Sequence, residues 1–415
     1  MRILWVCGTP AGALAERRGL KMSSGQWINA EIAKEKALSE NELFFCTSDD
    51  FEDRFSDGNI TYIVLPHGKV SRYVVNEQSI ASWSKLFDEI SPDVILVWGT
   101  EYEISRCAML ANGGKRPAVL YIQGVMRSVA ENYRGGLTDR EINKMTTLVE
   151  RLRKNSVYHL EARQVLAANR EKETVGLAGR IIVENDWAAE QYKGYCHDLR
   201  VYRNRLPMKK EFTEFDWKDS CDHSILTTAA AYPLKGLHVT LRALTRVLEH
   251  FPDTKLYVPG NNPFIAKGLK AKLKQSGYAK MIANYIKKNH LADKVIFTGP
   301  LSSEQYAEKM SRCNVFVSSS ATENHGSAIR EAMCVGIPCV CSNVGGLSSY
   351  ATDGLNCKLF DFPDSSQLAD EICELFGDAE LRRRLSRAGK DTVKKLYLEE
   401  PLDTMNEIYK KISEE

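Results

Sequence analysis

The sequence predicts an α/β protein with two doubly wound domains that face each other across a cleft, and a C-terminal helix that returns to the first domain. The chain has 415 residues, more than one hydrophobic core usually supports. Short apolar runs rich in β-branched residues alternate with stretches of helical period, as in parallel sheets covered by helices. The alternation stops at a charged segment, residues 203–223, and then starts again. We therefore expect ligands at the carboxyl ends of the strands of each domain.

The first domain is expected over residues 1–205. Its predicted strands are residues 2–7, 43–47, 60–65, 94–98, 118–122 and 180–183. Its predicted helices are residues 26–38, 77–90, 104–111 and 138–169. Pro207 lies in the charged segment that follows, so we expect the domain boundary there.

The second domain is expected over residues 206–396. Its predicted strands are residues 225–231, 255–258, 295–298, 315–318 and 337–341. Its predicted helices are residues 237–250, 265–288 and 327–334, together with one opened by the capping box Ser302-x-x-Gln305. A helical pattern then runs over 367–412 with a break near Glu400-Pro401, so residues 397–415 are expected to pack back on the first domain.

Composition excludes several classes of function. The 56 basic and 54 acidic residues give a net charge of +2, too little to hold a nucleic acid through its phosphates. Eleven cysteines, many of them in apolar runs, favour reduced thiols in a cytoplasmic protein. No paired Cys-x-x-Cys arms and no His-Glu-x-x-His occur, so we expect neither a metal site nor a cofactor. The apolar N-terminal run is too short for a signal peptide, and association with the inner face of a membrane stays open.

The most informative segment runs from Ser318 to Val340. A predicted strand ends there in small polar residues, and Gly326 opens a helix. The amides of Gly326, Ser327 and Ala328 would have no partner within that helix, so they form a potential site for a phosphate.

Two carboxylates flank this helix opening. Glu323 precedes the turn and Glu331 lies further along the helix, so both can point into one crevice. A carboxylate there could accept hydrogen bonds from the vicinal diols of a nucleotide sugar. Alternatively, Glu323 would only compensate the helix dipole and Glu331 would be a solvated surface residue. The strand–glycine–helix context favours the functional interpretation.

These glutamates form a Glu-x7-Glu motif that resembles the one in retaining GT-B glycosyltransferases, specifically the large family 4-type group. The similarity covers nearly all of the second domain, including Pro233-Leu-Lys235-Gly236. It implies two Rossmann-like domains and metal-independent transfer of a hexose from a nucleoside diphosphate sugar. It also implies that Glu331 holds the ribose, that Glu323 holds the transferred sugar, and that Lys235 and Gly236 lie at the diphosphate. A lysine after a strand is also suited, on charge alone, to stabilise a leaving diphosphate.

The chain departs from this family at three positions. Many relatives carry an arginine where this chain has Ala230, and Arg330 is one candidate to replace it. His325 stands where the family often has phenylalanine. Many relatives also have a sugar-contacting histidine after the strand that corresponds to residues 94–98, where this chain continues to Glu101.

The first domain offers further candidates. Gly12 and the pair Ser24-Gly25 bring small residues to the loops that line the phosphates or the acceptor in similar enzymes, although plain turns explain them nearly as well. Glu101 and Gln123 follow neighbouring predicted strands and are candidates for acceptor binding. The alternative role of Glu101 is to cap the helix after it.

We therefore expect a retaining glycosyltransferase that moves a sugar from a nucleotide sugar to an acceptor hydroxyl, in polysaccharide or glycoconjugate synthesis. The acceptor is expected to be a glycan, a lipid-linked glycan or a small molecule, and peripheral contact with a membrane stays open. Two alternatives remain: a nucleotide-sugar epimerase of the same fold, and a non-catalytic nucleotide-sugar-binding protein.

Overall fold

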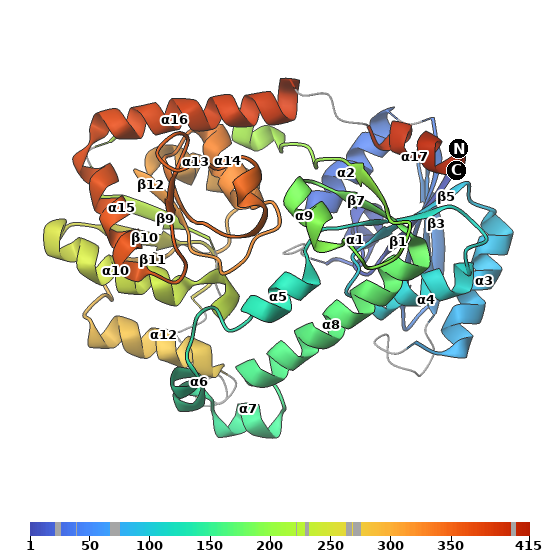
Figure 1. Cartoon of the computed structure of the whole chain (residues 1–415), viewed down its shortest axis with the longest axis horizontal. Helices are drawn as coiled ribbons and strands as arrows, with labels where there is room; N and C mark the ends of the chain where they lie inside the picture. Colours follow the sequence, from blue (N-terminus) through green and yellow to red (C-terminus); the bar gives the residue numbers. More distant parts are fainter. Residues whose placement is uncertain are drawn as a thin grey trace. The chain divides into compact units, whose positions relative to one another are not determined.

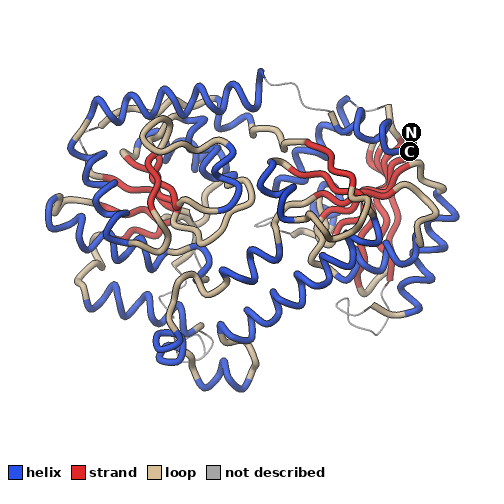
Figure 2. The backbone as a smooth tube through the Cα atoms, in the orientation of Figure 1, coloured by secondary structure: helices blue, strands red, loops and turns tan. Residues whose placement is uncertain are grey.

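The computed structural model divides the chain into two compact units, each built on its own sheet (Figure 1). The structure describes residues 1–20, 26–38, 40–66, 75–220, 222–228, 232–262, 268, 275–399 and 404–415. The first unit comprises Met1–Arg127, Val165–Pro207 and Pro401–Glu415, and the second comprises Ser128–Gln164 and Met208–Glu400. The prediction of two α/β domains with mainly parallel sheets is confirmed, and Figure 2 shows the strands of each unit flanked by helices.

The sheet of the first unit has the order β3-β4-β2-β1-β5-β6-β7-β8. Its strands are β1 (Arg2–Cys7), β2 (Glu42–Asp49), β3 (Asp53–Asp57), β4 (Ile60–Pro66), β5 (Val94–Trp98), β6 (Ala118–Tyr121), β7 (Arg180–Val183) and β8 (Arg200–Arg203). Its helices are α1 (Gly12–Arg17), α2 (Gln26–Leu38), α3 (Glu77–Ile90), α4 (Glu103–Asn112), α9 (Asp186–Gln191) and α17 (Met405–Ser413). All strand pairs are parallel except β3 with β4, so most of the sheet needs helices on both faces.

The C-terminal helix α17 belongs to the core of the first unit, as predicted. Its apolar residues pack beside β1 on one face of the sheet. The indole Nε1 of Trp5 donates a hydrogen bond of 3.0 Å to the hydroxyl of Tyr409, and both side chains are fully buried. The apolar face of α17 therefore packs on a sheet whose strand β1 lies some 400 residues earlier in the chain.

The sheet of the second unit has the order β11-β10-β9-β12-β13-β14, with all its pairs parallel. Its strands are β9 (Ser224–Thr227), β10 (Lys255–Val258), β11 (Val295–Phe297), β12 (Val315–Ser318), β13 (Cys339–Ser342) and β14 (Lys358–Phe360). Its helices are α6 (Asp139–Met145), α7 (Leu148–Leu152), α10 (Leu237–His250), α12 (Gly277–Lys288), α13 (Ser303–Arg312), α14 (Ser327–Val335), α15 (Ser365–Gly377) and α16 (Ala379–Lys394). The short turns η1 (Lys210–Thr213), η2 (Pro233–Lys235), η3 (Gly345–Ser349) and η4 (Lys395–Glu399) complete it.

The segment Ser128–Gln164 groups with the second unit, although the sequence placed it inside a continuous domain of residues 1–205. Two helices, α5 (Met126–Asn132) and α8 (Val157–Ala178), carry the chain across the division. Tyr133 and Ile142 are buried in the same core as Leu237 of α10. The helical period of this segment predicts which of its residues form an apolar face. It does not predict which unit that face packs against, so the sequence could not assign the segment to a unit.

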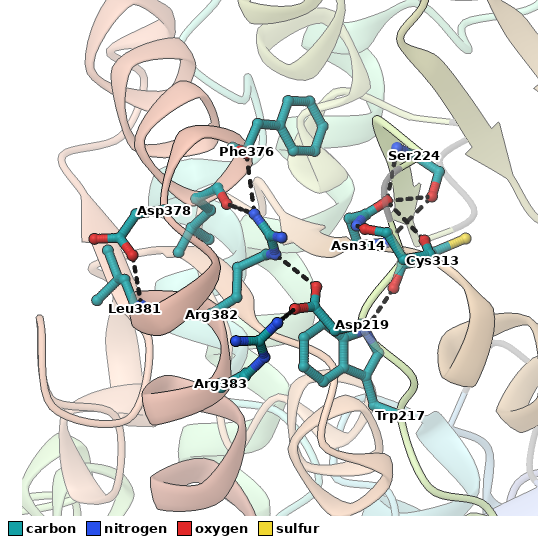
Figure 3. A network of polar contacts seen from close by, with 12 residues as sticks. Trp217, Asp219, Ser224, Cys313, Asn314, Phe376, Asp378, Leu381, Arg382 and Arg383 are labelled. Carbon is teal, nitrogen blue, oxygen red and sulfur yellow. Dashed lines mark hydrogen bonds and ion pairs between the residues drawn. The ribbon is translucent and has the colours of Figure 1, made fainter.

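The segment that leads into β9 is tied to the second unit by polar contacts (Figure 3). Trp217 donates from its indole Nε1 to the carbonyl of Cys313 at 2.7 Å. Asp219 accepts from Arg382 Nε at 2.9 Å and pairs with Arg383 at 3.1 Å. These anchors hold the residues just upstream, which contribute to the site below.

Among the helices that the structure describes, none combines the length and the apolar character needed to cross a bilayer. The described cysteines are free thiols, and most of them are buried.

Candidate functional site

Lys235 and Glu323 come together in the second unit. Lys235 ends the turn η2, and Glu323 lies in the loop between β12 and α14. The ammonium Nζ of Lys235 donates to Glu323 Oε1 at 2.6 Å, and the two side chains are 27% and 17% exposed. Burial lowers the pKa of Lys235 and the Glu323 carboxylate raises it, with a net rise, so the ammonium stays charged at neutral pH.

The backbone around this pair depends on a glycine at position 236. Gly236 has φ +69°, and a Cβ there would lie 1.7 Å from the carbonyl oxygen of Ser319. The amide of Ala321 donates to the carbonyl of Leu234 at 2.8 Å, which ties η2 to the loop after β12. This close approach of two backbones fixes Lys235 beside the loop that carries Glu323.

The N-cap residue of α14 is Gly326, which has φ +59°. No side chain caps this helix, and its first amides, those of Ser327 and Ala328, lack partners within it. The hydroxyl of Tyr350 donates to the carbonyl of His325 at 2.9 Å and so supports the turn from behind. The predicted helix opening with uncapped amides is therefore present in the described structure, and its role as a phosphate site stays a prediction.

Glu331 pairs with a lysine that sequence reasoning missed. Lys209 donates from Nζ to Glu331 Oε1 at 2.9 Å, and these side chains are 26% and 12% exposed. Lys209 also lies 5.6 Å from the ring centroid of Phe212. The only signal in the sequence was the charge of residues 203–223, because a pairing across 122 positions needs the folded backbone.

Arg330 and His325 both contact Tyr397 of η4. The Arg330 guanidinium donates to the Tyr397 hydroxyl at 2.7 Å and lies 4.8 Å from the centre of its ring. His325 Nε2 is hydrogen-bonded to the same hydroxyl. Arg330 is buried in this cluster. The cation that pairs with Glu331 is Lys209.

The candidates in the first unit lie at the ends of β1, β5 and β6. The amide of Gly12 donates to Asn29 Oδ1 at 2.9 Å, so this amide is already occupied. Glu101 and Gln123 are half-buried just beyond β5 and β6, which are neighbouring strands. Burial raises the pKa of Glu101.

Three positions named from the sequence, Ser24, Gly25 and Ala230, lie outside the residues that the structure describes.

Another carboxyl of the first unit, the fully buried Glu171, could not be singled out from the sequence. It accepts a hydrogen bond from the Thr100 hydroxyl and another, of 3.0 Å, from the amide of Met126. Burial, partly offset by these hydrogen bonds, raises its pKa to about 7. Its place in the middle of α8 gave no sign of a contact with Thr100, in the loop after β5.

Within the described ranges, no group of three or more His, Cys, Asp or Glu side chains could hold a metal ion.

Sequence comparisons find relatives of about half of the chain. Residues 210–392 match the family model described as "Glycosyl transferases group 1". An uncharacterized glycosyltransferase of Methanocaldococcus jannaschii is 30% identical over 192 residues, which cover 46% of this chain and 48% of that protein. The N-acetyl-alpha-D-glucosaminyl L-malate synthase of Bacillus anthracis is 27% identical over 207 residues, 49% of each. The chain thus spans about half the length of the curated relatives it matches.

Solved structures resemble the whole chain. HepE of Anabaena in complex with UDP-glucose has a TM-score of 0.64 at 16% identity, covering 100% of this chain and 98% of HepE. The sucrose-phosphate synthase of Thermosynechococcus elongatus has a TM-score of 0.63 at 16% identity, covering 100% and 97%. At this identity the likeness concerns the fold, which is that of GT-B glycosyltransferases. The sequence match adds the family model, glycosyl transferases group 1, which residues 210–392 match over somewhat less than half of the chain.

Proposed function

We propose that the protein is a retaining glycosyltransferase that uses a nucleoside diphosphate sugar. The observation that carries this proposal is the Lys235–Glu323 pair beside the uncapped opening of α14, inside the segment that matches the family model. A cation and free amides at one loop suit a diphosphate, and a carboxylate beside them suits sugar hydroxyls.

Each paired residue keeps capacity for a donor. An ammonium has three hydrogens, and Glu323 takes one of those of Lys235, so the others can reach phosphate oxygens. A carboxylate has about four acceptor positions, so Glu331 can accept from a ribose diol while Lys209 remains bound. In this proposal Glu323 holds the transferred sugar, while Gly326, Ser327 and Ala328 supply backbone to the diphosphate.

The chemical step requires stabilisation of charge on the leaving diphosphate. The bond between the anomeric carbon and the diphosphate oxygen breaks through an oxocarbenium-like state. The acceptor oxygen bonds to the same face of that carbon, which retains the configuration, and its proton passes to the leaving diphosphate. Lys235 and the α14 amides stabilise the departing charge more than the bound donor, and this difference accelerates transfer.

The names and bound ligands of similar proteins support the choice of donor. HepE of Anabaena was solved with UDP, with UDP and glucose, and with UDP-glucose. The relatives include D-inositol 3-phosphate glycosyltransferases from several bacteria. A nucleotide sugar and a hydroxylated acceptor are therefore the substrates we propose for this chain, whereas none of these relatives supports the epimerase alternative.

The proposal is tested first by donor binding and then by product analysis. Nucleoside diphosphates and their sugars are screened by thermal shift, because a ligand of the folded state raises the apparent stability. The best donor is then incubated with glycan, lipid-linked and small-molecule acceptors, and the anomeric configuration of the product is determined by NMR. A new glycoside with the donor's configuration supports the proposal. Inversion, epimerised donor, or binding without any product across the panel would contradict it.

A further inference from the structure

Residues of α6, α10 and α12, three helices of the second unit that Figure 1 labels, line a pocket. Its volume is about 700 Å³, within the range of small-molecule sites in proteins. None of the residues assigned to the donor lines it.

The walls of this pocket carry an excess of positive charge. Lys144 of α6 and Lys280 and Lys288 of α12 line it. In the part of the chain that the structure describes, these three ammonium groups make no ion pair. The fourth cation, Arg242, is neutralised by Glu141 at 2.6 Å. Three unpaired lysines around one cavity repel one another, and an anion would relieve that repulsion.

The rest of the lining is largely apolar or uncharged. Met145, Met281 and Ile282 contribute apolar surface, and Tyr285 adds an aromatic ring. The lining therefore combines cationic with apolar side chains, which suits an anion on a hydrophobic body rather than a free inorganic ion.

Two other groups at this pocket, the Gly277 amide and the His238 side chain, are not available to bind an anion. The amide of Gly277 at the start of α12 donates to Glu150 Oε1 at 2.8 Å, so this helix end is already occupied. His238 contacts the Gly135 carbonyl at 2.8 Å and the Tyr278 hydroxyl at 3.1 Å. Burial and the nearby Arg242 lower the pKa of His238 to about 4, so it is neutral at pH 7. The positive charge that would attract an anion is therefore that of the three lysines.

We propose that this pocket binds an organic phosphate with an apolar substituent, as a site separate from the donor site. The proposal goes beyond the proposed function, because it concerns other residues and is tested without turnover. The phosphate would be held by Lys144, Lys280 and Lys288, and the apolar part would lie against Met145 and Met281.

The test uses octyl phosphate below its micellar concentration, measured by isothermal titration calorimetry on the full chain. We expect one molecule to bind, with at least tenfold weaker affinity in K144Q/K280Q/K288Q. The matched control K218Q/K287Q/K395Q removes the same charge from exposed lysines outside the pocket and should change the affinity less than twofold. Absence of binding, or an equal loss in both triple variants, would overturn the proposal.

Two further arms locate the probe and its natural source. K235Q should bind octyl phosphate as the unchanged chain does, and loss of binding there would place the probe in the donor site and overturn the proposal. Sedimentation with phosphatidic acid vesicles, lost in K144Q/K280Q/K288Q but not in the control triple, supports the pocket and identifies a lipid phosphate. Octyl phosphate binding without such sedimentation supports the pocket and identifies a soluble phosphorylated compound. Circular dichroism verifies that both triple variants fold.

Discussion

Glu323 and Glu331 of the second unit lie in electrostatic surroundings opposite to those of Glu101 and Glu171 in the first unit. In the second unit Glu323 and Glu331 each hold a lysine, at 2.6 Å and 2.9 Å. In the first unit Glu101 and Glu171 sit where burial raises their pKa values, and no cation is among the groups that shift either of them. Charge is thus kept where a diphosphate would need it. Burial makes the two carboxyls of the first unit harder to ionise, and in our proposal this unit receives an uncharged, hydroxyl-rich acceptor.

The largest effect is expected from Lys235→Gln. Removing a cation that stabilises developing charge should lower kcat about 10²–10³-fold. Steady-state transfer assays with the identified donor measure this. Because the single change leaves Glu323 without its partner, the double variant Lys235→Gln/Glu323→Gln is the control for folding. The double variant should recover the thermal stability but not the activity. Recovery of activity would mean that Lys235 only neutralises Glu323.

Gly236→Ala tests whether packing fixes Lys235. A Cβ would lie 1.7 Å from the Ser319 oxygen, so we expect a loss of about 3 kcal/mol in the free energy of unfolding. The matched variant is Gly299→Ala, since Gly299 has φ +80° with open space around it. That variant should lose only about 1 kcal/mol, the cost of the left-handed backbone alone. Urea denaturation measures both, and equal losses would contradict the packing argument.

Glu331→Gln should weaken nucleoside diphosphate binding about tenfold or more, because a charged hydrogen-bond acceptor for the ribose is lost. Lys209→Gln should have a smaller effect, about fivefold, since in our proposal it only orients Glu331. Isothermal titration calorimetry gives both dissociation constants, with Glu249→Gln, an exposed position, as the control. A larger effect from Lys209 than from Glu331 would reverse the assigned roles.

In the first unit, Glu171→Gln should change how the stability depends on pH. Its pKa is raised to about 7 from the ordinary 4.5, so the folded chain binds more protons than the unfolded chain between these pH values. The stability contribution of this group is therefore fully present below about pH 4.5 and is lost as the pH rises through about 7.

The glutamine variant should not show this loss, and at pH 8 it should be more stable than the unchanged chain by about 2 kcal/mol. Urea midpoints at pH 5, 6, 7 and 8 test this. Parallel pH profiles of the two proteins would show that Glu171 does not titrate in this range.

Most of the strands could be predicted from the sequence because strands inside a parallel sheet are buried on both faces and therefore form continuous apolar runs. The strands Val94–Trp98, Arg180–Val183 and Val315–Ser318 match the predicted ranges. The strands β3, β8 and β14 were not predicted, since each is a short run with charged residues at the edge of its sheet.

The candidate site also has contacts that the sequence could predict and contacts that it could not. Lys235 and Glu323 follow adjacent strands, so topology alone could bring them together, and the structure does so. Lys209, Tyr397 and Glu171 could not be found, because each acts through a contact between distant segments. Arg330 was named from its place beside the motif, but its partner Tyr397 lies 67 residues away and depends on how η4 packs.

The most direct test of the account compares nucleoside diphosphate affinity between variants of the two units. The diphosphate that raises the melting temperature most is titrated into Lys235→Gln, Glu331→Gln, Glu101→Gln and Glu171→Gln. Binding should weaken at least tenfold in the first two and change less than twofold in the last two. Unchanged binding in both variants of the second unit, or loss confined to Glu101→Gln and Glu171→Gln, would contradict the claim that the second unit holds the donor.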